Sequence, residues 1–175
     1  MKKIRNSVFE TNSSSTHSIC VCKENRGIVF PEKIDINIQD YEFGWEHEKY
    51  SSTDEKLAYI IMGITARYYS QGITETCKKI ELLLKTIGQW IKRVSVHGLY
   101  FLCYDGSAYI EEEDYGYVDH ASEMEELLDA VLNDEETLKR YLFSSDSFIL
   151  TGNDNCDDDI EIKVDYPYDE YYKGN

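Results

Sequence analysis

Two consecutive stretches of helical periodicity constrain the fold of this chain more than any other feature. Residues 52–55 form the capping-box pattern Ser-x-x-Glu, after which apolar residues recur three or four positions apart up to Tyr69. A break at residues 71–72, Gln-Gly, interrupts the pattern, which resumes from Thr74 to Val94. The spacing predicts two amphipathic helices, each with an apolar face that other segments must cover.

Segments with strand character lie on both sides of these helices. Runs of alternating, β-branched and aromatic residues predict the strands, and an Asp-Gly pair at residues 105–106 predicts a hairpin with a two-residue turn. The last two strands are expected to pair with each other. The predicted strands are residues 16–23, 27–30, 33–38, 98–104, 107–110, 147–151 and 160–164.

Two shorter helices are expected in the second half of the chain, each after a Ser or Asn that stands three residues before a glutamate. Ser122 caps the first, which runs through residue 132, and Asn133 caps the second, which runs through residue 141 or 143. Helices and strands together predict an α+β fold, in which antiparallel sheet packs against several helices. A length of 175 residues without a Pro-rich or Gly/Ser-rich linker predicts a single domain.

The net charge of −16 is distributed unevenly along the chain. Residues 1–103 hold 14 basic and 12 acidic residues, a net charge of +2, whereas residues 104–175 hold 4 and 22, a net charge of −18. General nucleic-acid binding requires the opposite sign, so direct contact with nucleic acid is not expected. We instead expect a near-neutral part and a strongly acidic part, the second of which associates with a basic partner.

The acidic part carries clusters of carboxylates on several predicted elements, with tyrosines between them. Duplex DNA presents one negative charge per roughly 1.7 Å of axis, and a folded surface of similar charge density would occupy a basic nucleic-acid channel. The expected partner is a basic nucleic-acid-binding protein, and the alternative is an acidic surface that only maintains solubility. The residues predicted to contact the partner are Glu111, Glu112, Glu113, Asp114, Glu123, Glu125, Glu126, Asp157, Asp158 and Asp159.

A second candidate site lies near the N-terminus, where residues 11–18 combine six hydroxyl side chains, one amide and one imidazole. Backbone N–H groups and hydroxyls of such a loop can bind an anion, so a phosphate or nucleotide ligand, or an enzyme acting on one, is an alternative function. No third group that would orient a histidine base can be identified, and we expect no catalytic residue. A polar turn is the simpler interpretation. The ligand-binding candidates are Asn12, Ser13, Ser14, Ser15 and His17.

The string from Arg5 to Ser18, which contains Val-Phe-Glu-Thr-Asn-Ser-Ser-Ser-Thr-His-Ser, resembles the N-terminus of a family of small bacteriophage and prophage proteins. Residues 41–46 and 56–59 resemble a second block of the same family, so the resemblance covers about the first third of the chain. It implies a phage-related setting and no activity that could be carried over. Because phages must disarm host nucleases, it favours an anti-defence inhibitor, such as an anti-CRISPR or anti-restriction protein. A phage accessory or structural protein is the alternative.

Neither a metal nor a cofactor is expected. Cys20 and Cys22 have a spacing that differs from zinc-ribbon motifs, and two thiols on one core face explain them more simply. The acidic loop at residues 153–159 lacks the glycine and the final glutamate of an EF-hand. No apolar stretch follows the basic N-terminus and no run spans a bilayer, so we expect a soluble protein of the bacterial cytoplasm without membrane contact.

Overall fold

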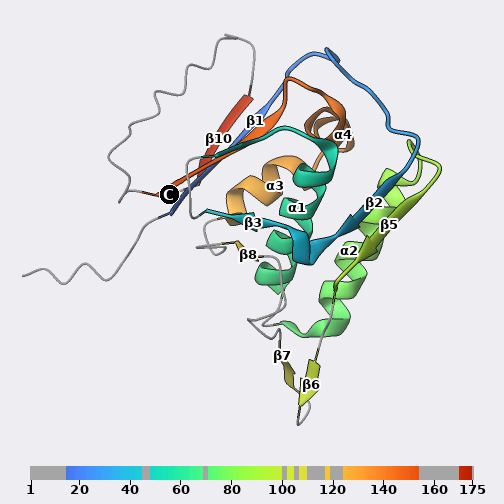
Figure 1. The fold of residues 1–175 in the computed structure, drawn as a ribbon, viewed down its shortest axis with the longest axis vertical. Coiled ribbons are helices and arrows are strands. Elements are labelled where there is room, and N and C mark those ends of the chain that lie inside the picture. Colours follow the sequence, from blue (N-terminus) through green and yellow to red (C-terminus); the bar gives the residue numbers. More distant parts are fainter. Residues whose placement is uncertain are drawn as a thin grey trace, which may run out of the picture.

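A computed structural model of the chain describes residues 15–44, 48–68, 71–99, 102–104, 107–109, 117–118, 124–153 and 170–174. Within these ranges the chain forms four α-helices, one four-stranded antiparallel sheet and three two-stranded sheets. The predicted α+β fold, with antiparallel sheet packed against several helices, is confirmed (Figure 1).

The four-stranded sheet joins segments from both ends of the chain. Its order is β10 (Glu170–Gly174), β1 (Ser15–Val21), β9 (Phe148–Asn153) and β4 (Glu48–Tyr50), and every pairing is antiparallel. β1 lies inside the sheet, and its residues 17–21 are buried on both faces. A strand from the near-neutral part is therefore enclosed by two strands from the acidic part.

One predicted strand pairing and one predicted strand are wrong. Both edges of β9 are already paired along Ile149–Thr151, by β1 and β4, so the expected partner at residues 160–164, itself outside the described residues, has no free edge there. Residues 27–30 form no strand, because this segment lies against the C-terminal end of a helix instead of another strand. Its contacts there include an isolated bridge from Ile28 to Ser144, a bond from Val29 N to Phe143 O of 3.0 Å and a bond from Ser145 N to Gly27 O of 3.1 Å.

Helix α1 (Thr53–Tyr68) is the centre of the core. Its capping box is formed as predicted, because Glu55 N donates to Ser52 Oγ at 3.2 Å and Ser52 N donates to Glu55 Oε2 at 2.9 Å. All residues from 56 to 64 are buried, so α1 is covered on every side over this length. Sheet, strands and the other helices are arranged around it.

Helix α2 (Ile73–Ile87) is shorter than predicted, and the expected continuation to Val94 is wrong. Gly88 forms the C-cap, and the chain turns there through a bond from Trp90 N to Ile87 O of 2.9 Å. Residues 94–97 then form β5 (Val94–His97), parallel to β2 (Ile34–Asn37). The apolar residues after Gly88 keep the helical spacing in the sequence. In the structure, however, they lie in a turn and pack against the core.

Helices α3 (Glu125–Leu132) and α4 (Glu135–Phe143) follow each other closely. α3 begins directly at Glu125, after Met124 as N-cap, so Glu125 does not take the third position of a Ser122 cap. The cap of α4 is Asp134 instead of Asn133, because the Asp134 carboxylate accepts from Thr137 N at 2.7 Å. Both helices are thus confirmed, and both predicted caps are wrong by one or two residues.

The remaining elements are short. The predicted hairpin is confirmed by strands β6 (Leu102–Tyr104) and β7 (Ser107–Tyr109), which pair Tyr104 with Ser107 on either side of the expected turn. The other two strands, β3 (Glu42–Phe43) and β8 (Tyr117–Val118), pair in parallel, and a 3-10 turn covers Ile38–Asp40.

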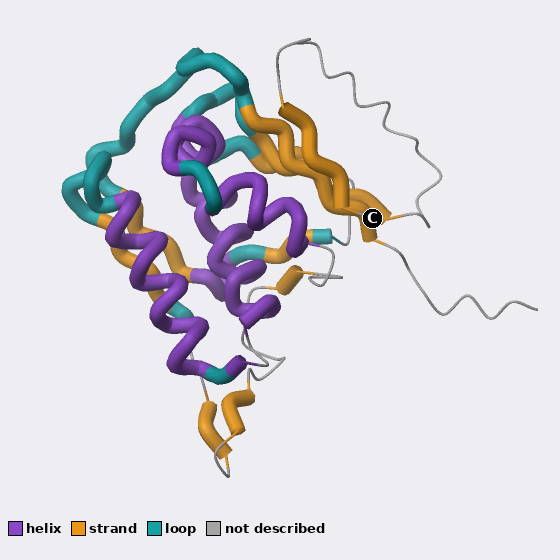
Figure 2. Tube along the Cα trace, turned by 180° about the vertical axis from the view of Figure 1, so that it is seen from behind, coloured by secondary structure: helices purple, strands orange, loops and turns teal. Residues whose placement is uncertain are grey.

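The elements form successive layers. Helices α1, α3 and α4 lie between the four-stranded sheet on one side and α2 with the β2–β5 pair on the other (Figures 1 and 2). α3 contacts β10, α4 contacts β1, and α1 contacts α2 and β2. Among the described helices, none has the length and apolar character needed to cross a membrane.

Candidate functional site

The structure locates only part of the predicted partner-binding set. Glu125 and Glu126 lie in the first turn of α3. Glu111, Glu112, Glu113, Asp114, Glu123, Asp157, Asp158 and Asp159 lie outside the described residues. The structure therefore places these two residues in α3 and leaves the convergence of the acidic clusters as a prediction.

The N-terminal ligand candidates divide in the same way. Asn12, Ser13 and Ser14 lie outside the described residues, and Ser15 is the first residue of β1. The His17 side chain is fully buried, and its ring centroid lies 5.9 Å from that of Tyr59 on α1. A ligand of this imidazole would have to enter the protein core.

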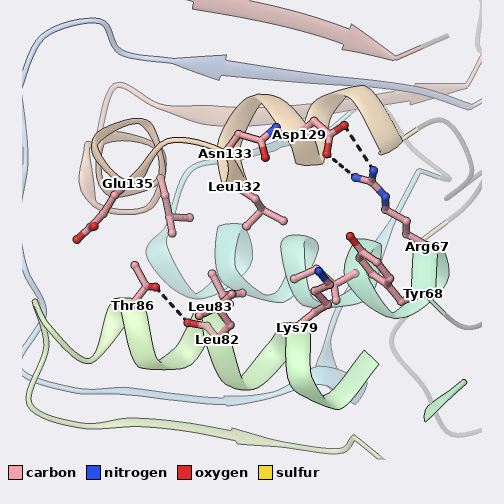
Figure 3. Close-up of a pocket in the computed structure, with 12 residues that line it drawn as sticks. Arg67, Tyr68, Lys79, Leu82, Leu83, Thr86, Asp129, Leu132, Asn133 and Glu135 are labelled. Carbon is pink, nitrogen blue, oxygen red and sulfur yellow. Dashed lines mark hydrogen bonds and ion pairs between the residues drawn. The ribbon is translucent and has the colours of Figure 1, made fainter. Parts of the chain in front are cut away.

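Three helical segments line a groove on the helical side of the molecule. It has a volume of about 390 Å³, and we call it the three-helix groove (Figure 3). α1 contributes Ile64, Arg67 and Tyr68, and α2 contributes Lys79, Leu82, Leu83 and Thr86. The α3–α4 segment contributes Asp129, Leu132, Asn133, Glu135 and Leu138.

Helical periodicity explains the two walls of the groove. Lys79, Leu82, Leu83 and Thr86 are spaced by three and four residues, which places them on one face of α2. The opposite wall combines the last turns of α3 with the first turns of α4. Figure 3 shows the labelled side chains of the two walls on either side of the open space, with α1 between and behind them.

Gly63 sets the distance between the helix that forms the floor and one of the walls. A Cβ at this position would lie 2.6 Å from Met124 Cε and 3.1 Å from Leu128 Cδ2. A larger residue at position 63 would therefore force the Met124 and Leu128 side chains to move. The close approach of α1 and α3 is what brings Asp129, the residue after Leu128, within reach of Arg67.

The two cations of the groove already have acidic partners. Arg67 forms a two-pronged ion pair with Asp129, with N–O distances of 2.6 and 3.4 Å (Figure 3). Lys79 lies 3.9 Å from Glu75, and its ammonium is 5.1 Å from the Tyr68 ring centroid. Glu135, at the other end, forms no ion pair with any residue in the described part of the chain.

This arrangement is suited to binding. Five of the twelve described lining residues are aliphatic and four are charged, a combination that can recognise an amphipathic ligand. The Thr86 hydroxyl is engaged by Leu82 O at 3.1 Å, and among the described lining residues there is no His, Cys or Ser that would provide a nucleophile with a base. The described ranges also contain no group of three His, Cys, Asp or Glu residues placed to hold a metal ion.

Comparison with known proteins does not indicate a function for this chain. The chain matches no protein-family model, no curated protein and no solved structure. The resemblance of its N-terminus to phage proteins therefore stays a prediction.

Lys56 is a buried lysine whose environment was not predicted from the sequence. It is 1% exposed, and its ammonium donates to Ser144 O at 2.9 Å and to Ser147 O at 3.1 Å, at the C-terminal end of α4. Burial lowers the pKa of Lys56 to about 8, although the nearby Glu55 opposes the shift. The sequence feature that could have indicated the burial of Lys56 is its position four residues before the buried Ile60, on the apolar stripe of α1.

Proposed function

We propose that this protein is a non-enzymatic, acidic interaction protein that binds the basic surface of a nucleic-acid-binding protein. The observation that carries the proposal is the net charge of −18 in residues 104–175, against +2 in residues 1–103. The phage-like N-terminus favours an inhibitor of a host defence nuclease, an anti-CRISPR or anti-restriction protein, in the bacterial cytoplasm. Carboxylates would take the place of DNA phosphates in the channel of the partner.

The described part of the acidic region supports this proposal. Residues 125–136 contain six acidic residues and neither Lys nor Arg, and they form α3 and the start of α4 beside the three-helix groove. Opposite charge on two surfaces steers their encounter and selects the partner more than it adds affinity. The negative charge therefore predicts fast, salt-dependent association with a basic protein.

A capture experiment tests the proposal. The full-length protein is immobilised and exposed to a bacterial host lysate at low and high salt, and the captured proteins are identified by mass spectrometry. We expect nucleic-acid-binding proteins with basic surfaces, which are released as salt rises because screening weakens exposed charge pairs. Capture that is indifferent to salt, or that yields no basic protein, would count against the proposal.

A charge-reversal pair makes the same experiment specific. The variant with Glu111, Glu112, Glu113 and Asp114 changed to Lys should lose at least about tenfold in affinity, since several charged contacts are reversed. The matched control reverses four exposed acids of the near-neutral part, Glu24, Glu32, Glu42 and Glu81. It changes the net charge by the same amount, so an equal loss in both variants would assign the binding to net charge alone.

The two alternatives have their own tests. The structure adds little support for a phosphate or nucleotide ligand at residues 12–17, because the His17 side chain is buried in the core. Thermal-shift measurements with nucleotides and inorganic phosphate test it directly. A phage accessory or structural protein, whose acidic face only maintains solubility, would be found in purified virions.

A further inference from the structure

We infer that the three-helix groove binds an amphipathic α-helix of the partner, with the apolar face of that helix in the groove and its basic flank along α3–α4. The inference rests on the proposed function for the charge of the partner. Its location and the helical form of the ligand come from the groove itself. This site would anchor the partner by apolar contacts, in addition to the electrostatic contacts of the acidic region.

The dimensions of the groove suit the anchors of a helix. Its volume of about 390 Å³ lies within the ~300–1,000 Å³ range of ligand-binding clefts. From Lys79 to Thr86 the α2 wall rises by about 10 Å, at roughly 1.5 Å per residue. Apolar anchors at positions i, i+3 or i+4, and i+7 of a bound helix cover the same length.

Leu82 marks the apolar mouth of the groove. Its side chain is 61% exposed, whereas its neighbours in the same helix, Ile80, Leu83 and Ile87, are buried. A large aliphatic side chain in water is unfavourable by about 25 cal/mol for each Å² that a partner would cover. Among the residues of the groove, Leu82 would therefore contribute the most favourable free energy when an apolar ligand covers it.

The charges around the groove select a basic helix. Residues 125–136, which form α3 and the start of α4, have a net charge of −6 in the sequence, and Asp129 and Glu135 of this segment line the groove. By comparison, α2 holds three Lys and two Glu. The lining cations Arg67 and Lys79 are already held by Asp129 and Glu75, and Glu135 forms no ion pair within the described ranges. Lysines or arginines on one flank of the ligand would pair with the α3–α4 segment.

A second copy of the chain is a poorer occupant than a basic helix. It would add another net charge of −16 to the assembly, and like charges on two approaching molecules oppose association. Self-association is nevertheless measurable, and it is one of the outcomes that the following experiment separates.

The test uses a synthetic amphipathic peptide with leucines at helical spacing i, i+3, i+4 and i+7 and lysines on one flank. A scrambled peptide of identical composition has the same charge and no apolar face. Binding of each to the full-length protein is measured by calorimetry. We expect the amphipathic peptide to bind at least about tenfold more tightly, because only it presents anchors to the groove.

Two variants with matched controls locate the site. Leu82→Gln and Glu135→Lys should each weaken binding of the amphipathic peptide by about fivefold or more, since one removes an apolar contact and the other a charge. Val29→Gln removes a side chain that is 70% exposed outside the groove, and Glu81→Lys reverses an exposed charge of α2 that does not line it. Both controls should bind like the wild type. All four sites are exposed, and thermal unfolding checks that each variant is folded.

Four outcomes overturn the inference. Equal binding of both peptides would leave charge as the only determinant, which removes the groove site and leaves the proposed function intact. Unchanged binding by Leu82→Gln and Glu135→Lys would place the helix elsewhere. A dimer in light scattering that Leu82→Gln converts to a monomer would assign the groove to a second copy. Failure of both peptides to bind would contradict the helix site, while the lysate capture still decides the proposed function separately.

Discussion

Lys56 shows how one residue connects two helices in this fold. It belongs to the first turn of α1, and its ammonium binds carbonyl oxygens of Ser144 and Ser147, just beyond the last turn of α4. Carbonyls at a helix C-terminus carry partial negative charge, so a cation there is favourable. The same burial that excludes water also disfavours the charged amine, and the site balances these two effects.

Removal of this side chain should destabilise the fold. Lys56→Ala leaves a cavity and two carbonyl oxygens without their donor, and we expect the free energy of unfolding to fall by about 2–4 kcal/mol. The control Lys92→Ala removes an exposed lysine and should change it by less than about 0.5 kcal/mol. Urea unfolding measures both. Equal effects in the two variants would mean that the buried ammonium contributes nothing specific.

Stability should depend on pH through the same lysine. In the folded protein the pKa of Lys56 is lowered to about 8 from its ordinary 10.5, so between these values the unfolded chain binds the additional proton. Stability therefore rises as pH increases above 8. Lys56→Met, which keeps the volume but cannot titrate, should lack this rise. A pH profile of the variant parallel to that of the wild type from pH 7 to 10 would contradict this reading of Lys56.

Buried tyrosines set the upper limit of that rise. Burial raises the pKa of Tyr59 and Tyr141 above the ordinary value of 10.0, and the same holds for the partly buried Tyr50. Above pH 10 the unfolded chain loses protons that the folded protein keeps, so stability falls. The full profile of the wild type should rise above pH 8 and decline above pH 10, and thermal unfolding at each pH records it.

At the scale of elements, the start of α4 tests which residue caps it. The Asp134 carboxylate accepts from Thr137 Oγ1 at 2.5 Å and from Thr137 N at 2.7 Å, and these two bonds hold the pKa of its carboxyl below the usual range. Asp134→Ala should lower the free energy of unfolding by about 0.5–2 kcal/mol, as loss of an N-cap generally does. Asn133→Ala, at the position that the sequence pattern favours, should cost less than about 0.5 kcal/mol. The reverse order of the two effects in urea unfolding would restore Asn133 as the cap.

Local patterns predicted elements whose signals lie within a few residues. The capping box of α1 and the Asp-Gly hairpin needed only neighbouring residues, and both were predicted correctly. The end of α2 was not, because Trp90 and Ile91 continue the helical spacing while Gly88 and the pairing of β5 with β2 end the helix. Tertiary contacts of this kind override local preference.

The candidate site depended even more on distant contacts. Acidic residues at 125–136 were visible in the sequence, and Glu125 and Glu126 were predicted to bind a partner. The groove beside them was not predictable, because its lining comes from α1, α2 and α3–α4, which meet only after folding. Gly63, which allows α1 and α3 to approach, carries no signal in a single sequence.

At the scale of the whole molecule, the two differently charged parts of the chain share one sheet. β1 from the near-neutral part lies between β9 and β10 from the acidic part, and α1 packs against α3 and α4. The near-neutral part therefore supplies the central helix and an inner strand, and α3, α4, β9 and β10 of the acidic part pack against them. Acidic residues of α3 and α4 are thus held on a packed framework, and such preorganisation reduces the entropy lost when a partner is bound.

Competition with DNA tests the central claim most directly. A basic nucleic-acid-binding protein captured from the host lysate is loaded with fluorescently labelled duplex DNA, and the acidic protein is titrated in at low salt. We predict that it releases the DNA, with a fall in fluorescence anisotropy, and that reversal of Glu111, Glu112, Glu113 and Asp114 to Lys abolishes the release. A complex that holds the acidic protein and the DNA together would contradict the claim that its carboxylates occupy the phosphate-binding surface.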